Sequence, residues 1–145
     1  MFLMRLKNFI STTLALLLTL VLLVCAQGLR VCRFWDIAGK RCFYLQSKSS
    51  QAVIKEEILP WELFLVQGES VTFPCEDREQ TLAEILQRYG ARVLFEECAG
   101  GSISYYCVTI NWTDGIQIDG EYVNLHVAFN GGYCAVGYPI IFGGF

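Results

Sequence analysis

The sequence predicts an α+β fold: an N-terminal transmembrane or signal helix, then one amphipathic helix packed on an antiparallel sheet of about five strands. Three observations support this prediction. An uncharged, mostly apolar segment covers residues 8–29, and apolar residues recur at helical spacing within residues 78–89. After that helix, glycine-containing turns at residues 99–101, 119–120 and 130–131 separate segments rich in β-branched and aromatic residues.

Composition limits the class of protein. The chain has 145 residues, with 11 Lys and Arg against 14 Asp and Glu, so its formal net charge is −3. This acidic balance gives no electrostatic reason to bind DNA or RNA, and we expect no nucleic-acid partner. With 54% hydrophobic residues the chain is too apolar to be disordered. The residues that follow the apolar segment are enough for one domain.

Residues 1–29 have the layout of a signal-anchor or a signal peptide. Arg5 and Lys7 precede a leucine-rich run that ends in small residues, and a cleavage site before Gln27 is present. The uncharged segment is also long enough to remain in a bilayer as one helix. We expect an uncleaved anchor that contacts the membrane through residues 8–29, and a cleaved signal is the alternative.

The flanking charges give conflicting signals on orientation. Residues 30–50 are basic, and we interpret them as a juxtamembrane linker; by the positive-inside rule such a flank favours a cytoplasmic domain. The signal-like layout of the N-terminus favours export instead. We expect a single-pass cell-membrane protein whose α+β domain, residues 51–145, is extracytoplasmic. A secreted domain is the alternative.

The first part of the predicted domain carries the weakest signals of secondary structure. Residues 51–59 are predicted to form a short helix, which Pro60 would end. Strands are predicted over residues 61–66 and 70–73.

The clearest helix prediction covers residues 78–89. Asp77 stands at its N-cap, and Gly90 stands where a left-handed residue ends a helix. Glu84 and Arg88 are expected to pair on the exposed side. Four residues form the apolar stripe at i, i+3, i+4 and i+7: Leu82, Ile85, Leu86 and Tyr89.

Three hairpins are predicted after this helix. A two-residue turn at Gly100–Gly101 places Phe95 opposite Tyr106 and Val93 opposite Val108, with all four facing the core.

The Asp119–Gly120 turn places Ile116 opposite Val123 in the second hairpin. In the third, a two-residue turn at Asn130–Gly131 is preferred over a three-residue turn because it pairs Val127 with Cys134 and keeps the apolar faces together. The residues then expected on the inner face are Val123, Leu125, Val127, Phe129 and Cys134. Those expected on the outer face, beneath residues 51–73, are Tyr105, Cys107, Tyr122, Asn124 and His126.

No residue set is typical of a catalytic, cofactor-binding or metal site, and we predict none of the three. His126 is the only histidine, and we expect a surface imidazole rather than the base of a cysteine enzyme. The six cysteines after Cys25 lack zinc-ligand spacing; they are typical of buried thiols or, in an exported domain, of disulfides. The acidic residues around Asp77 complement the helix dipole. Asn111 begins an N-glycosylation sequon, which we interpret as a turn-rich loop.

The C-terminal part of the chain resembles a known family. The stretch combines Tyr105–Tyr106, the segment Val123-Asn124-Leu125-His126-Val127-Ala128 and the tail Gly137-Tyr138-Pro139-Ile140-Ile141. It resembles the YwmB family of sporulating Firmicutes, whose fold is described as similar to that of the TATA-box-binding protein. The resemblance implies a membrane-anchored or exported α+β domain of a spore-former. It brings no catalytic residues.

These observations favour a membrane-anchored, non-enzymatic interaction domain with an unknown protein partner, associated with sporulation if the resemblance holds. A secreted, disulfide-stapled binding domain is the second hypothesis, and a thiol-based enzyme is the third.

Overall fold

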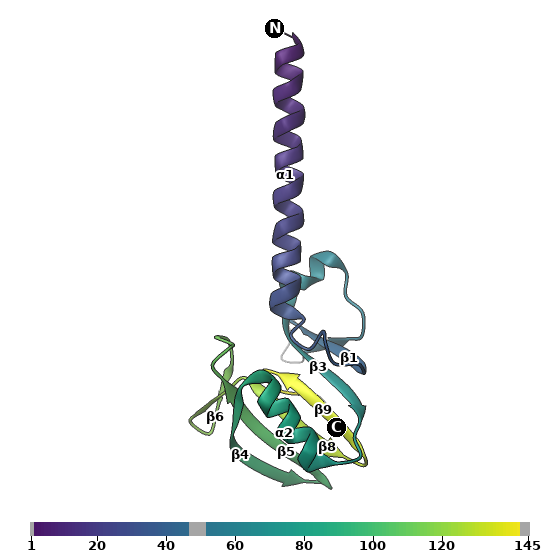
Figure 1. Cartoon of the computed structure of the whole chain (residues 1–145), viewed down its shortest axis with the longest axis vertical. Coiled ribbons are helices and arrows are strands. Elements are labelled where there is room, and N and C mark those ends of the chain that lie inside the picture. The colour runs from purple at the N-terminus through teal and green to yellow at the C-terminus, as the bar shows by residue number, and fades with distance from the viewer. Residues whose placement is uncertain (1, 47–51, 143–145) are drawn as a thin grey trace.

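The computed structural model describes residues 2–46 and 52–142 and shows a long N-terminal helix that rises from an α+β domain (Figure 1). Helix α1 covers Phe2–Val31. The predicted fold class and the N-terminal apolar helix are confirmed, while the sheet is larger than expected, with seven strands. Residues 47–51 and 143–145, which belong to the predicted linker and α+β domain, lie outside the described residues.

The seven-stranded sheet is antiparallel at every pairing and has the order β2-β1-β3-β9-β8-β5-β4. A separate two-stranded hairpin consists of β6 and β7. The strands are β1 (Lys40–Leu45), β2 (Val53–Lys55), β3 (Val66–Pro74), β4 (Ala91–Ala99), β5 (Ser102–Thr109), β6 (Ile116–Ile118), β7 (Glu121–Val123), β8 (Leu125–Asn130) and β9 (Tyr133–Tyr138).

Helix α2 (Arg78–Tyr89) has the predicted bounds and caps. The Asp77 side chain accepts a hydrogen bond from the Gln80 amide at 2.9 Å, and Gly90 ends the helix with φ of 58°. Of the predicted stripe, Ile85 and Tyr89 are buried, and Leu82 and Leu86 pack on the same core from its edge.

The predicted ion pair on the exposed side of α2 is replaced by other contacts. Arg88 pairs with Asp36 at 3.1 Å, and Glu84 accepts from Gln80 at 2.9 Å. Asp36 follows α1 in the chain, so this ion pair joins the two helical parts of the molecule, which spacing within α2 cannot predict.

The β4–β5 hairpin confirms the Gly100–Gly101 turn and the Phe95–Tyr106 pair, but the pairing of Val93 was wrong. An irregularity at Leu94 places Val93 opposite Cys107. Because a bulge puts two residues opposite one, Val93 and Phe95 face opposite sides of the sheet.

The predicted faces of β5 are also reversed. Tyr105 and Cys107 pack on the core beside α2, whereas Tyr106 lies on the opposite face and stacks between Phe95 and His126. The alternation along β5 is regular, and its core face is set by the pairing with β8, which places Cys107 opposite Leu125 and Tyr106 opposite His126.

The third hairpin turns at Gly131–Gly132 rather than at Asn130–Gly131. Both glycines have positive φ, 56° and 84°, which costs glycine less than any other residue. Phe129 therefore pairs with Cys134, and Val127 with Val136. The register moves by an even number of residues, so the predicted inner-face set of β8 and Cys134 is still buried. The Ile116–Val123 pair of the second hairpin is confirmed.

The region before β3 differs most from the sequence predictions. Residues 53–55 form strand β2 where a helix was expected, and η1 (Pro60–Leu65) is a 3-10 helix where a strand was expected. The predicted strand 70–73 is confirmed within β3. Residues 30–50, expected as a linker, contribute β1, which lies between β2 and β3.

Phe34 explains why the sheet begins so early in the chain. Its side chain is fully buried in the main core, between α2 and the sheet. A second, smaller cluster joins the last residue of α1, Val31, to Phe43 and Leu45 of β1. A chain that starts at residue 51 would lose both contributions, so the folded unit includes the end of α1.

The face assignment of α2 predicts an asymmetry between neighbouring positions. Ile85→Ala should lower the free energy of unfolding by about 2–5 kcal/mol, because it opens a cavity in the core. Glu84→Ala, next to it on the exposed side, should cost about 0.5 kcal/mol or less. Urea unfolding of the full chain in detergent, followed by near-ultraviolet circular dichroism, measures both. Equal losses would contradict the packing described.

Candidate functional site at the foot of the N-terminal helix

A pocket of about 510 Å³ lies where α1 meets the sheet. It is bounded by the last turns of α1, the η1–β3 segment, the loop that follows β5, and the C-terminal segment after β9. The polar and charged residues lining it are Gln27, Arg30, Arg33, Gln46, Gln67, Asp114 and Tyr138.

The loop of residues 110–115 is held by Asn124, which lies between strands β7 and β8. The Asn124 side chain accepts from the Thr109 amide at 2.8 Å and donates to the carbonyls of Thr109 and Trp112 at 2.8 and 3.0 Å. Tyr122 donates its hydroxyl to the Thr113 carbonyl at 2.5 Å. Asn124 is fully buried, so these bonds satisfy a polar group that would otherwise be costly. They fix the position of Asp114.

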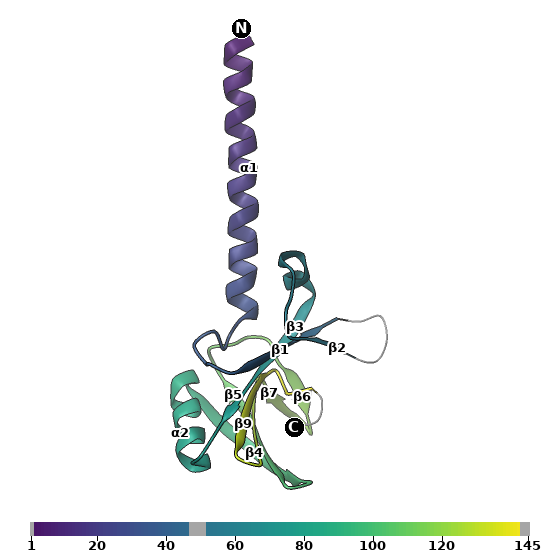
Figure 2. The ribbon, with the colours of Figure 1, turned by 90° about the vertical axis from the view of Figure 1, so that its right-hand side faces the viewer.

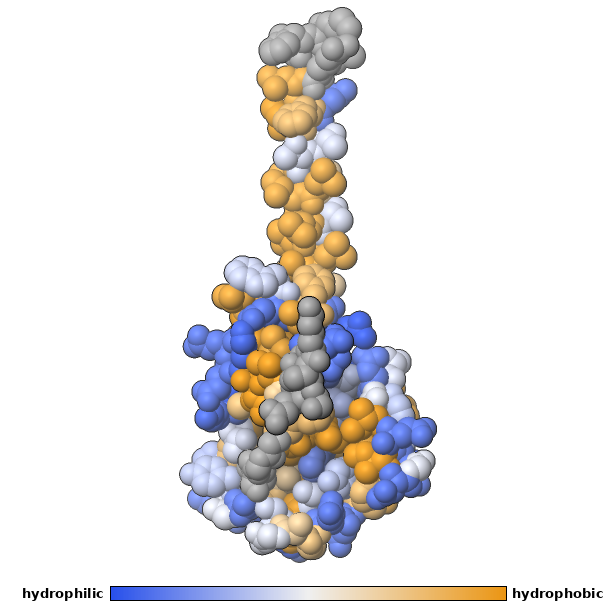
Figure 3. Space-filling view, turned by 180° about the vertical axis from the view of Figure 1, so that it is seen from behind, coloured by the Kyte–Doolittle hydropathy of each residue, from blue (hydrophilic) through white to orange (hydrophobic). Residues whose placement is uncertain are grey.

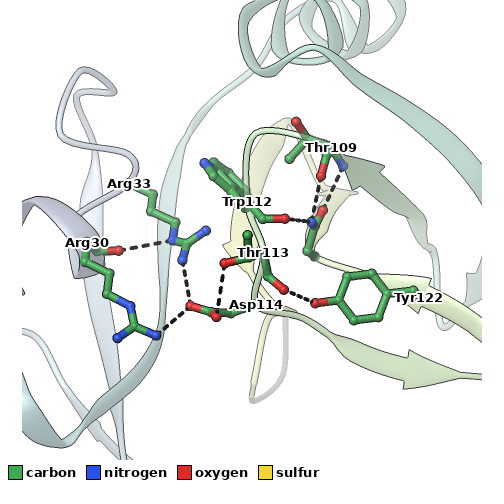
Figure 4. Close-up of polar contacts among 8 residues, drawn as sticks. Arg30, Arg33, Thr109, Trp112, Thr113, Asp114 and Tyr122 are labelled. Atoms are coloured by element: carbon green, nitrogen blue, oxygen red, sulfur yellow. Dashed lines mark hydrogen bonds and ion pairs between the residues drawn. The ribbon is translucent and has the colours of Figure 1, made fainter.

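Asp114 in turn holds the end of α1. Its Oδ2 lies 2.9 Å from Arg30 Nη2 and 3.3 Å from Arg33 Nη2, so one carboxylate bridges two guanidinium groups (Figure 4). The hydrogen bond and charge of Arg30, together with Arg33, lower the pKa of Asp114 despite the opposing effect of burial. Arg33 also donates from Nε to the Arg30 carbonyl at 3.1 Å.

Arg33 is held from its other side by aromatic rings. Its guanidinium carbon lies 3.6 Å from the ring centroid of Tyr138 and 4.9 Å from that of Trp112. Trp112 also makes edge-to-face contacts with Phe34 and Tyr138 and a tilted contact with Tyr89. Only 9% of the Arg33 side chain is exposed, so a charge is kept inside the fold by one carboxylate and two π faces.

A second buried charge secures the residue after Arg33. Glu69 of β3 is fully buried and accepts the Phe34 amide on Oε1 at 2.8 Å. Arg41 of β1 lies 3.8 Å from Glu69 Oε2 and donates from Nη2 to the Phe34 carbonyl at 2.7 Å. Burial raises the pKa of Glu69, against the lowering effect of the Phe34 amide and Arg41. Both backbone groups of Phe34 are thus bound by side chains, the amide by the buried Glu69 and the carbonyl by the partly buried Arg41.

The charged residues of the lining determine which chemical groups the pocket suits. Two arginines and one aspartate give its lining a formal charge of +1, which suits an anionic or polar group. Among the described lining residues there is no cysteine or histidine, so the pocket has no nucleophile with an adjacent base. Among all described residues, no cluster of His, Cys, Asp and Glu could hold a metal ion.

The prediction that His126 is a surface residue was wrong. Only 6% of it is exposed, because the segment after β9 folds back over the outer face of the sheet and the Ile141 amide donates to His126 Nδ1 at 3.1 Å. Tyr106 stacks on the ring at 4.5 Å. Gly137 pairs with His126 on the neighbouring strand, and its lack of a side chain makes space for Ile141. A Cβ at this position would lie 2.6 Å from the Ile141 side chain. The C-terminal segment, rather than residues 51–73, lies over His126, while Tyr122 is exposed.

The cysteines are separated from the histidine. All seven are free, and Cys107 and Cys134 are fully buried in the core. Both lie on the face of the sheet beside α2, so the expectation that Cys107 lies on the outer face was wrong. His126 faces the other way, and burial raises the pKa of Cys107 to about 12. The structure therefore brings no thiol of the core to the imidazole.

The remaining sequence candidates have local roles. The acidic group at residues 76–79 lies at the start of α2 as expected. Asn111 lies in a loop, as interpreted, and its side-chain amide donates to the Tyr89 carbonyl at the end of α2, 2.9 Å away. Sequence reasoning missed Glu69, Asp114 and Arg33, because the partners of their ion pairs lie 28 or more residues away. The basic cluster at the end of the apolar segment was visible but was interpreted as a solvated flank.

The bridge at Asp114 predicts unequal roles for its two arginines. Asp114→Ala should lower the free energy of unfolding by about 1–3 kcal/mol, because Arg33 loses its only carboxylate and remains buried; partial exposure of Asp114 limits the loss. Arg30→Ala should cost markedly less, because that side chain is 63% exposed. Urea unfolding of the full chain in detergent compares the two. A larger loss for Arg30→Ala would contradict this assignment.

His126 predicts a loss of stability on acidification. Burial lowers its pKa to about 4, below the ordinary 6.5, so between these values the unfolded chain binds the proton more readily. The contribution of His126 is complete above pH 6.5 and is lost as the pH falls towards 4, up to about 3 kcal/mol. His126→Phe keeps a ring against Tyr106 and should flatten this part of the stability profile. An unchanged slope would show that His126 does not titrate in this range.

Comparison with known proteins identifies no family for this chain. No family model matches it, and neither does any curated protein or solved structure. The resemblance to the YwmB family therefore stays an expectation from the sequence, and the functional argument rests on the geometry of α1 and of the pocket at its foot.

Proposed function

We propose that this protein is a membrane-anchored, non-enzymatic interaction domain, with α1 as its single span and the α+β domain extracytoplasmic. The observation that carries the proposal is the state of α1: residues Leu6–Val31 are long and apolar enough to cross a membrane, and none of their most apolar window is buried by the domain. A core helix hides its apolar residues, whereas these leucines are exposed around the whole helix. A bilayer is the solvent that suits such a surface.

The way α1 ends supports an anchor rather than a removed signal. The helix continues without a break through the cleavage site before Gln27, and its last turns belong to the domain through Val31 and the Asp114 bridge. The span and the domain are therefore joined stiffly. The free state of the six cysteines beyond the span favours this hypothesis over a disulfide-stapled secreted domain.

Most of the positive charges of the basic flank have carboxylate partners. Arg30 and Arg33 bind Asp114, Lys40 binds Glu56 at 2.7 Å, and Arg41 lies beside Glu69. Four of the five positive charges that favoured a cytoplasmic domain thus have carboxylate partners within the fold, while Lys48 lies outside the described residues. The proposed extracytoplasmic orientation rests on the signal-like layout of the N-terminus.

The separation of His126 from the buried cysteines supports a binding role over thiol catalysis. The pocket at the foot of α1 is the site we assign to the interaction, with a protein partner that presents an anionic or polar group. The resemblance to the YwmB family adds a spore-forming host, which would be tested by following expression of the protein through sporulation.

Fractionation and labelling test the anchor and its orientation together. The full chain with a C-terminal tag should stay in the membrane after alkaline carbonate extraction and keep its N-terminus by mass. An impermeant maleimide should label intact cells at Cys98, an exposed cysteine of β4, and Cys98→Ser should remove that label. A soluble chain beginning at Gln27 would favour the secreted alternative, and labelling only after lysis would reverse the orientation.

A further inference from the structure

We infer that η1 is a second membrane contact, which rests in the lipid interface beside α1 and fixes the orientation of the domain on the bilayer. The inference rests on the proposed anchoring by α1 and concerns a different part of the chain. Three observations support the inference: the apolar side chains of η1 are exposed, η1 lies beside the last turns of α1, and Glu62, the one charged residue of η1, is paired within the domain.

Four apolar side chains of η1 and the residue before it face solvent, and we call them the η1 patch. Their exposed fractions are high for apolar residues: Leu59 49%, Trp61 66%, Phe64 56% and Leu65 46%. Residues 58–67 contain a single charged residue, Glu62. Four large apolar residues exposed within seven positions form a contiguous surface of the kind that marks a contact with a membrane or a protein.

The position of η1 along the axis of α1 indicates that the η1 patch contacts a membrane rather than a protein. The Gln27 side chain donates from Nε2 to the Leu63 carbonyl at 3.2 Å, so η1 lies beside the last turns of α1, as both ribbon views show (Figures 1 and 2). Gln27 is about 5 Å along the helix from Arg30, the first charge after the apolar segment. If residues 8–29 cross the bilayer, Gln27 and η1 lie at its interface.

The chemistry of the patch suits that depth. Tryptophan is enriched at membrane interfaces, where its ring contacts lipid and its N–H stays near water. In the space-filling view apolar residues continue from α1 onto the adjoining surface of the domain (Figure 3). Continuity with the apolar surface of α1 is the reason to assign lipid rather than a protein as the occupant.

The one charge of the segment is turned away from this surface. Glu62 is 14% exposed, forms an ion pair with Lys55 of β2 and accepts the Leu59 amide at 2.9 Å. These bonds lower the pKa of Glu62 and keep the carboxylate paired within the domain. The η1 patch can enter the interface without desolvating an unpaired charge.

Two membrane contacts restrict the orientation of the domain more than one contact does. A single helix leaves the domain free to rotate about the helix axis, whereas a second contact beside it fixes which side faces the lipid. Phe64 and Leu65 belong both to the η1 patch and to the lining of the pocket. The pocket is therefore held at the level of the lipid headgroups.

Depth-dependent fluorescence quenching tests the inference on the full chain in phosphatidylcholine vesicles. Flotation of the vesicles first shows whether α1 is inserted. Tryptophan emission is then measured with bromines near the top or near the end of the lipid chains, for the natural chain and for Trp61→Phe. Bromines near the top should quench the natural chain more strongly, and Trp61→Phe should lose most of this quenching.

A matched control moves the indole to the far end of the domain. Tyr133 is 53% exposed and pairs with Pro74, at the end of β3 remote from η1. The double variant Trp61→Phe, Tyr133→Trp should regain emission that iodide quenches from water and that bromines do not.

The outcomes separate this inference from the anchoring by α1. A chain that does not float overturns both. A chain that floats while Trp61 is quenched by iodide overturns the η1 contact and leaves the anchor standing. A floating chain whose Trp61 is protected from both quenchers would show that a protein, a second copy included, covers the patch, and this also overturns the lipid contact.

Discussion

The structure depends on the way the chain leaves α1. Arg33 and Phe34 come two and three residues after the end of the helix. Phe34 lies in the main core, and Arg33 lies between Asp114 and two aromatic rings. The backbone of Phe34 is bound on its amide side by Glu69 and on its carbonyl side by Arg41. Through Arg33 and Phe34, the end of α1 is therefore attached to strands β1, β3 and β9 and to the loop of residues 110–115.

This junction explains why polar residues are buried so densely in a small domain. Each buried charge has a partner that comes from a distant segment: Asp114 for Arg33, and Arg41 for Glu69. Such pairs add little net stability compared with apolar packing, because desolvation offsets much of the attraction, but removing one member leaves an unpaired charge. Their effect is to specify a single arrangement of α1 on the sheet, which would suit the proposed role of α1 as a membrane anchor.

The sheet is covered on both faces by different means. Helix α2 packs its Ile85–Tyr89 side on one face, and the C-terminal segment crosses the other and shields His126. The outer strand β4 is an edge, and its bulge at Leu94 and the acids Glu96 and Glu97 are features that oppose edge-to-edge pairing with another chain. Many of the apolar residues left exposed lie on α1 and η1, while others, among them Ile110 and Tyr133, lie elsewhere on the domain.

The sequence by itself determined the features that depend on neighbouring residues. The apolar span, helix α2 with its Asp77 and Gly90 caps, and the Gly100–Gly101 and Asp119–Gly120 turns follow from local periodicity and backbone preference. The inner face of β8 followed from its alternation.

Only the tertiary structure decided the features that depend on partners far along the chain. Residues 40–45 have no clear pattern and become a strand because β2 and β3 offer their edges on either side. The core face of β5 was set by its pairing with β8, which places Cys107 opposite Leu125 and Tyr106 opposite His126. The pocket was invisible because Arg33, Asp114 and Tyr138 meet only after folding. Hydrogen bonds and ion pairs at a separation of some 80 residues leave no periodic trace in a sequence, since their geometry is set by the packing that brings the segments together.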